Sequence, residues 1–332
     1  MDIIQIIFNI LQMGLPCCLL ALGIFLTYRL LDFADLTAEG SFLLGAATTG
    51  VMIYNEFNPW LATLMGALIG FACGMVTGTL NRVLKVPKLL SGIITMTATT
   101  SIAFLIFGMR SDIHDLFATD VFIDTEYGSP VQTIFSLLYP YKYSESIGMY
   151  VSAFEYSADL VRTAVMLGVI AIVMLGVYFF FGTQYGMAIR ATGMNETMAK
   201  AQGINTDLAT IICVGLANAL IGLAGALYVQ SMRNASVTSA QGFLVVGLAS
   251  IIIGETIFGK RSFKNWIISV ALGAVVYYII VNIALRLGME PHLMTLLYAI
   301  LIVIALCVPL VKTQILKVIK KRKARTEEKN NA

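Results

Sequence analysis

The chain has 332 residues, of which 58% are hydrophobic and 12% charged, and its formal net charge is +3. Soluble globular domains carry about 25% charged residues, so this composition excludes an ordinary soluble domain and indicates an integral membrane protein. The small net charge gives no reason to expect a nucleic-acid partner. The five cysteines fall inside apolar runs without C-x-x-C spacing, so we expect neither a disulfide framework nor a metal site.

Apolar runs long enough to cross a bilayer recur along the chain. Each is close to the ~20 residues that a membrane-spanning helix needs. We therefore predict an all-α, polytopic membrane protein of about nine spans, within a range of about eight to ten. The predicted spans cover residues 3–27, 40–56, 59–80, 88–108, 161–182, 207–229, 241–258, 266–285 and 292–311.

Lysine and arginine collect on alternate connections between these spans. The positive-inside rule makes that side cytoplasmic, which places the N-terminus outside and the C-terminus inside. Residues 313–332 are then a basic cytoplasmic tail, which we interpret as a solvated charge run touching anionic lipid. The basic residues that set the orientation, apart from those of the tail, are Arg29, Arg82, Lys85, Lys88, Arg190, Lys200, Lys260, Arg261 and Lys264.

The connection over residues 110–160 is long and acidic, and this topology places it outside the cell. It holds eight acidic residues against Arg110 and Lys142, with six interleaved tyrosines. A loop of this length in a compact domain usually has a function or is disordered. Two interpretations are open: a cap that receives an extracellular partner, or tyrosines that lie in the lipid headgroup belt.

A polar stretch, Gln184–Asn205, separates two apolar runs on the predicted cytoplasmic side. We predict one short helix here, because Asn195 is a good N-cap and Glu196 places a negative charge at the positive end of the helix. Gly203 supplies the left-handed residue that ends it. So short a helix needs a partner surface for stability. It is a candidate for transmitting force from a soluble subunit; the alternative is an ordinary interfacial loop helix.

An internal repeat appears when the chain is compared with itself at an offset of 201 residues. Gly14 falls on Gly215, Thr37 on Thr238 and Phe42 on Phe243. The predicted topology turns one half over relative to the other, giving inverted halves at about 1–110 and 206–312. Inverted repeats are common in transporters, with a pathway at the repeat interface near the midplane of the bilayer.

Each half contains a polar break, at residues 30–42 and 233–243. Non-helical backbone at membrane depth survives only where it is buried in protein or lines a wet cavity. The breaks are therefore candidate gate or pathway elements; equally, they could be surface loops with the N-caps Thr37 and Ser239. The candidate pathway residues are Phe33, Asp35, Thr37, Glu39, Thr238 and Phe243.

The sequence offers little sign of catalytic chemistry. His114 and His292 are the only histidines and lie far apart, so neither a metal site nor a catalytic triad is visible. The stretch 254–261, GETIFGKR, has Arg where a phosphate loop needs Ser or Thr. We expect no cofactor and no enzymatic activity of the chain itself.

The stretch GMAIRATGMNETMAKAQGIN, followed by an apolar helix with GLAGAL, resembles the cytoplasmic loop of branched-chain amino acid type permeases of bacterial ABC importers. The residues that match the family pattern are Gly186, Arg190, Ala191, Asn195, Ala199, Gly203, Ile204 and Asn205. The stretch YRLLDFADLTAEGSF also resembles the family's segment after the first span, in a version suggesting a subgroup with amino acids, including tryptophan, among its substrates.

The resemblance implies a type II-like permease fold as one transmembrane domain over residues 1–312. It implies a plasma-membrane importer of a small solute, with an amino acid expected. The implied partners are two cytoplasmic ATPase subunits, a second permease copy (identical or a paralogue) and an extracytoplasmic binding protein. The loop 183–206 would dock the ATPase through Arg190, Met194, Asn195, Glu196, Met198, Ala199 and Gly203. The alternative function is a secondary transporter with inverted repeats.

Overall fold

The computed structural model describes residues 3–108, 133–135, 142–144, 149–151, 157–232 and 237–287, with isolated positions at 296, 300 and 303. Helices dominate these residues. They are α1 (Ile3–Phe25), η1 (Leu26–Leu30), α2 (Thr37–Tyr54), α3 (Pro59–Arg82), α4 (Lys88–Ile106), α6 (Ser157–Gly182), α7 (Gln184–Met194), α8 (Glu196–Ala201), α9 (Thr206–Met232), η2 (Val237–Ala240), α10 (Phe243–Phe258) and α11 (Phe263–Arg286). Two short antiparallel strands, β1 (Lys142–Ser144) and β2 (Met149–Val151), pair with each other.

The helical character predicted from hydropathy is confirmed, and eight of the predicted spans each fall on one described helix. Within the described residues, six helices are long and apolar enough to cross a membrane; α10 is a shorter apolar helix. The basic tail lies outside the described residues, as do most of the span expected at 292–311 and most of the 110–160 connection. The total of about nine spans therefore stays a prediction.

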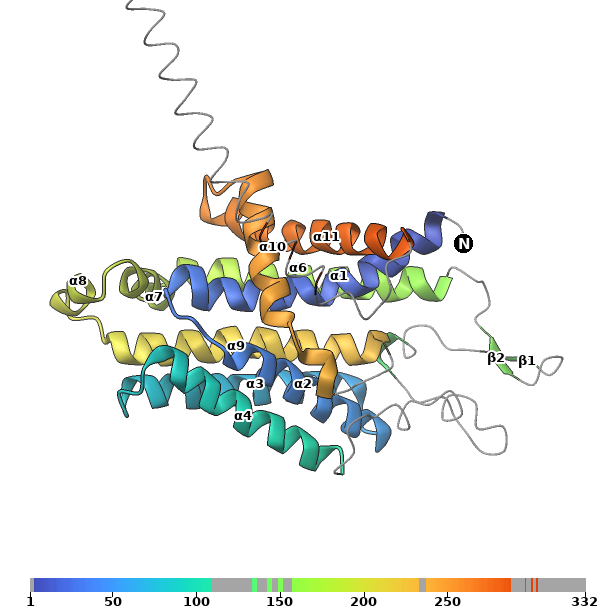
Figure 1. Ribbon diagram of the computed structural model, residues 1–332, viewed down its shortest axis with the longest axis horizontal. Coiled ribbons are helices and arrows are strands. Elements are labelled where there is room, and N and C mark those ends of the chain that lie inside the picture. The colour runs from blue at the N-terminus through green and yellow to red at the C-terminus, as the bar shows by residue number, and fades with distance from the viewer. Residues whose placement is uncertain are drawn as a thin grey trace, which may run out of the picture.

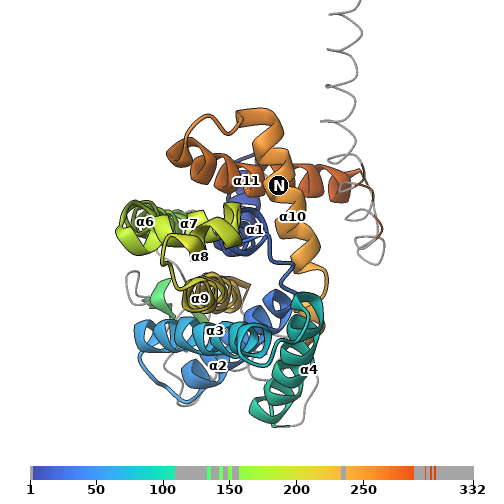
Figure 2. The same cartoon turned by 90° about the vertical axis from the view of Figure 1, so that its left-hand side faces the viewer.

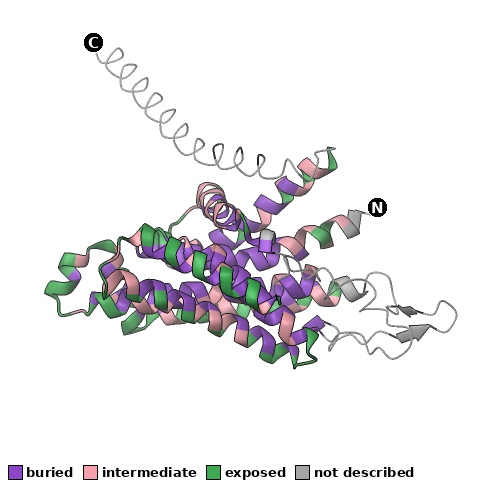
Figure 3. Ribbon diagram, turned by 60° about the horizontal axis from the view of Figure 1, so that its bottom comes forward, coloured by how far each residue is buried: buried purple, intermediate pink, exposed green. Residues whose placement is uncertain are grey.

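The fold is built around α9, which lies between α1 on one side and α3 on the other (Figure 2). α1 is also covered by α6, α10 and α11, whereas α2 and α4 pack with α3. In the 18-residue apolar stretch within Ile6–Leu30, 83% is buried, whereas in the corresponding stretch within Leu160–Gly182 only 17% is buried. The inner helices thus form the core, and exposed residues lie along the outer helices (Figure 3). Many of these exposed residues are large and apolar, as a lipid-facing surface requires.

Small residues set the distance between α3 and α9. Gly66, Gly70, Gly74 and Gly78 recur every four residues on α3 and face α9, where a Cβ atom would meet backbone atoms or side chains. Lipid gives helices no hydrophobic reason to associate, so close backbone approach through small residues is the usual basis of their packing in membranes. This four-residue spacing is visible in the sequence.

The elements before and after the middle of the chain follow the same order. A long helix, α1 or α9, is followed by a break, a shorter helix (α2 or α10) and another long helix (α3 or α11). α1 and α9 run in opposite directions along the bundle (Figure 1). The offset of 201 residues predicts these pairings, and the inverted repeat itself stays a prediction.

Replacing Gly70 with Leu is expected to destabilise the bundle. Its Cβ would meet the backbone carbonyl oxygen of Asn218, and overpacking of this kind costs about 1–3 kcal/mol. The matched control is Gly168→Leu on α6, where a Cβ would have no neighbour within 4 Å. Thermal unfolding of the purified proteins should give a lower midpoint for Gly70→Leu alone. Equal midpoints for both variants would contradict the α3–α9 packing argument.

Candidate coupling site and membrane breaks

The polar connection after α6 is two helices joined by a sharp bend, where the sequence predicted one. The first is α7, which begins after Thr183, whose side chain accepts a hydrogen bond from the Gly186 amide at 3.3 Å. It ends at Asn195, which has extended backbone angles. The Asn195 side chain then accepts a hydrogen bond from the Met198 amide at 3.0 Å and begins α8. The predicted N-cap is confirmed, but the same residue also ends the preceding helix.

The end of α8 has the geometry of a Schellman motif. Gly203 has a φ of +81°, and its amide donates to the Lys200 carbonyl at 3.0 Å. The next amide, of Ile204, donates to the Ala199 carbonyl at 3.1 Å. These two bonds satisfy carbonyl groups that the end of a helix otherwise leaves without partners. Gly203 therefore stops α8 through its backbone, as the sequence predicts.

The outer face around the α7–α8 bend carries apolar side chains that nothing within the described chain covers. Met194 is 87% exposed and Met198 59% exposed. Exposed Tyr185 and Met187 lie on α7. Ala199 faces the other way and is buried, which seats α8 on the bundle. An apolar surface of this kind, outside the predicted spans, is typical of a protein contact.

Arg190 behaves differently from the other candidate coupling residues. Its guanidinium lies over the ring of Phe263, 4.7 Å from the centroid, a cation–π contact. Phe263 begins α11. Arg190 therefore links α7 to α11 within the chain, while the methionines point away from it.

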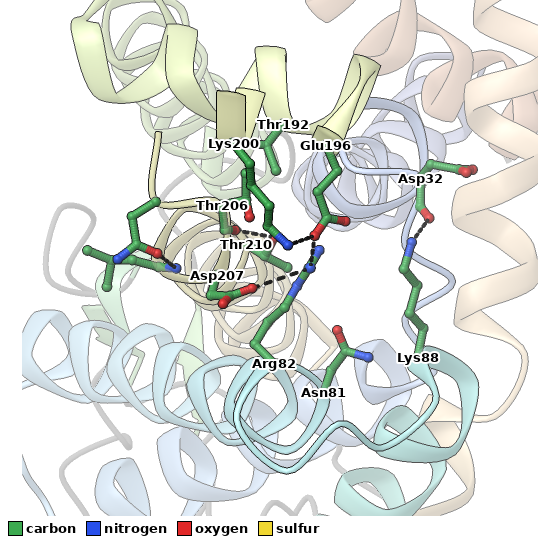
Figure 4. Close-up of polar contacts among 12 residues, drawn as sticks. Asp32, Asn81, Arg82, Lys88, Thr192, Glu196, Lys200, Thr206, Asp207 and Thr210 are labelled. Carbon is green, nitrogen blue, oxygen red and sulfur yellow. Dashed lines mark hydrogen bonds and ion pairs between the residues drawn. The ribbon is translucent and has the colours of Figure 1, made fainter. Parts of the chain in front are cut away.

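An ion-pair cluster attaches α8 to the rest of the bundle (Figure 4). Arg82, at the end of α3, places its Nη1 atom 2.6 Å from Glu196 Oε1 and 3.6 Å from Asp207 Oδ1. Lys200 Nζ lies 2.9 Å from the same Glu196 oxygen. The hydrogen bonds from Arg82 and then Lys200 lower the pKa of Glu196 to about 2, so Glu196 is charged at neutral pH.

The first polar break, residues 31–36, alternates between buried and exposed residues: Leu31, Phe33 and Asp35 are buried, whereas Asp32 and Ala34 are exposed. The Asp35 carboxylate accepts hydrogen bonds from the Thr37 amide at 2.9 Å and from the Asn218 side chain, in the middle of α9, at 2.6 Å. Thr37 and Thr77 share a hydrogen bond of 2.7 Å between their hydroxyl oxygens. Phe33 is also buried. Side chains of α3 and α9 thus anchor the buried residues of this non-helical segment within the bundle.

The second break contacts the beginning of α2. Glu39 Oε1 accepts a hydrogen bond of 3.0 Å from the amide of Gly242, the residue before α10, whose φ is +86°. The rings of Phe42 and Phe243 lie 4.5 Å apart between centroids. The predicted internal repeat aligns these two phenylalanines. Thr238 lies in η2, but its side chain is outside the part of the chain that the structure describes.

The candidate residues therefore form two separate groups. The coupling residues lie at one end of the bundle, and the break residues lie inside it, where α2, α9 and α10 meet. The sequence analysis did not identify Asn218 and Thr77 as residues that hold the first break, or Arg82 as the residue that holds α8. Asn218 had a usable signal, because a polar amide within an apolar span is a functional candidate. Within the described residues, no group of three His, Cys, Asp or Glu side chains could hold a metal ion.

Comparisons with known proteins agree with this architecture. Residues 6–306 match a family described as the permease component of the branched-chain amino acid transport system. A tyrosine transport system permease protein of Clostridioides difficile is 30% identical over 297 residues, covering 90% of this chain and 89% of its own. A galactofuranose transporter permease protein of Escherichia coli is 25% identical, covering 92% and 79%. No solved structure matches.

Removing the cap of α8 should loosen that helix alone. Asn195→Ala leaves the Met198 amide without its acceptor, a loss of about 1 kcal/mol, so amide hydrogen exchange over residues 196–202 should be about fivefold faster. Asn205→Ala is the matched control, because Asn205 caps α9 through the Leu208 amide. It should leave exchange in α8 unchanged. Unchanged exchange in Asn195→Ala would show that the cap does not hold α8.

Proposed function

The chain belongs to the family of branched-chain amino acid transport system permease components, and from this premise we propose that it imports an amino acid or a close relative. A permease of this ABC transporter family is a multi-pass membrane protein. The amino-acid class is supported by the relative named for tyrosine transport, at 30% identity over nine-tenths of this chain. More distant relatives are named for galactofuranose and fructose import and for nucleoside transport.

Two exposed methionines, Met194 at the end of α7 and Met198 in α8, carry this proposal. A six-residue helix cannot be stable by itself in water. Asn195 and Gly203 cap its two ends, and its apolar side chain Met198 is exposed. Methionine adapts to irregular grooves, so α8 is suited to insert into a groove on a cytoplasmic ATPase subunit. Two such subunits would serve two permease copies, identical or paralogous, and a binding protein would deliver the solute from outside. ATP hydrolysis then belongs to the partner chain and not to this one.

The breaks supply the moving part of the proposed cycle. Two inverted halves, with α1–α3 equivalent to α9–α11, would meet at the breaks, and a change of contacts there would open the pathway between them. Glu39 and Phe42 from the first half contact Gly242 and Phe243 from the second. These contacts join α2 to the start of α10, and we propose that they separate when the ATPase displaces α8.

The proposed orientation places α8 in the cytoplasm. Ion pairs and cation–π contacts of Arg82, Arg190 and Arg29 join neighbouring connections at the same end of the bundle as α8. The positive-inside rule supports a cytoplasmic position for this end, with the N-terminus outside. The alternative function, a secondary transporter, is less well supported, because the family is a transport-system permease component.

Met198→Asp should abolish uptake by releasing the ATPase. The charge would enter an apolar groove, at a cost of several kcal/mol if it is buried without a partner. Membrane insertion should be normal, because the residue lies outside every span. The measurements are ATPase stoichiometry after detergent purification and solute uptake in cells.

Thr197→Asp is the matched control, because it places the same charge on the neighbouring exposed residue, in the first turn of α8, where the helix dipole favours it. This variant should keep its ATPase. A Met198→Asp protein that retains its ATPase at normal stoichiometry would show that the docking element lies elsewhere.

Cysteine labelling tests the orientation independently of the partner. In a variant whose native cysteines are replaced, Asn55→Cys, between α2 and α3, should react with a membrane-impermeant maleimide in intact cells. Gln202→Cys, at the end of α8, should react only after the membrane is opened. Both native residues are exposed, so access to the reagent decides the result. The reverse pattern would overturn the proposed topology.

A further inference from the structure

Arg82 joins three helix ends, and its position suggests a role beyond docking. We infer that Arg82 is a positioning residue that makes α8, α3 and α9 move as one body when an ATPase displaces α8. This inference rests on the proposed function, because it describes how a movement at the ATPase contact reaches the membrane breaks.

Each charged residue of this cluster lies at a helix end whose dipole has the opposite sign. Arg82 lies in the last turn of α3, while Glu196 and Asp207 lie in the first turns of α8 and α9. A cation at a helix C-terminus and an anion at an N-terminus are both stabilised by the helix dipoles. The three ends therefore converge with complementary charges on one guanidinium group.

Burial distinguishes this cluster from an ordinary surface ion pair. The Arg82 side chain is 13% exposed, whereas those of Glu196 and Asp207 are 36% and 54% exposed. Exposed pairs contribute little because water competes for both partners. A guanidinium that is mostly shielded from water is strongly destabilised when its carboxylate partners are removed, because its charge is then buried without compensation. Arg82 is therefore the buried member of the cluster, and Glu196 attaches α8 to it.

A continuous chain of contacts leads from Arg82 to the breaks. α3 and α9 are in close contact along the glycine stripe from Gly66 to Gly78, so a displacement of one carries the other. In the middle of α9, Asn218 holds Asp35 in the first break. From α2, Glu39 then reaches the Gly242 amide of the second break. Each step is a direct contact, and the two breaks are the elements that can change arrangement.

The competing explanation is that the ion pair only helps α8 to fold or to dock. A docking role predicts loss of the ATPase from the complex, and a folding role predicts lower thermal stability. A positioning role predicts an assembled, stable complex that hydrolyses ATP but transports less solute for each ATP. The number of solute molecules imported per ATP hydrolysed therefore separates the three roles.

A double-mutant cycle on the complete complex in proteoliposomes, with the binding protein and a solute that it carries, provides the test. The variants are Arg82→Gln, Glu196→Gln and the double variant. Both single variants should lower import per ATP by at least about fivefold. The double variant should be no worse than either single one, because both substitutions break the same contact. Lys85→Gln, which removes an exposed charge three residues after Arg82, should resemble the wild type.

Two results would overturn the inference. One is import per ATP at the wild-type level in both single variants, with ATPase bound. The other is loss of ATPase or of thermal stability in step with transport, which would assign the pair to docking or folding. Failure of the proposed function would look different, because a wild-type complex would then show no ATP-dependent import or no bound ATPase.

Discussion

The structure depends on one constraint: backbone N–H and C=O groups inside a bilayer have no water to bind. Helices satisfy these groups internally, so each break in a helix needs partners from its neighbours. Asp35 and Glu39 meet this need, one by holding the Thr37 amide at the start of α2 and the other by binding the Gly242 amide before α10. These hydrogen bonds hold the described residues on either side of the breaks against neighbouring helices.

The same arrangement explains how a surface helix can act on the interior. α8 has little stability of its own, but Asn195 and Gly203 fix its two ends and Ala199 seats it on the bundle. Arg82 connects it to α3, whose glycines bring α9 into close contact. Packed helices transmit displacement because their interfaces are not compressible. The weak points along this path are the hydrogen bonds at the breaks, where a change of partner costs least.

Local signals predicted the parts of this structure that depend on neighbouring residues. The spans followed from hydropathy, and the ends of α8 followed from Asn195 and Gly203. Contacts between distant segments were not predictable, because Arg82–Glu196 and Asp35–Asn218 depend on the relative depth of helices. The bend at Asn195 was missed for a related reason. An asparagine that ends one helix and begins the next gives the same local pattern as a cap after a loop.

The central claim is that the two breaks separate when the ATPase binds ATP. Spin labels on the exposed residues Ala34 and Gln241, one in each break, would report this distance by pulsed electron paramagnetic resonance in the assembled transporter. A second pair, on Leu84 after α3 and Gln202 after α8, would report the distance between α8 and α3. The account predicts that trapping the ATP-bound state changes the first distance and leaves the second unchanged. A constant first distance, or a change confined to the second, would contradict it.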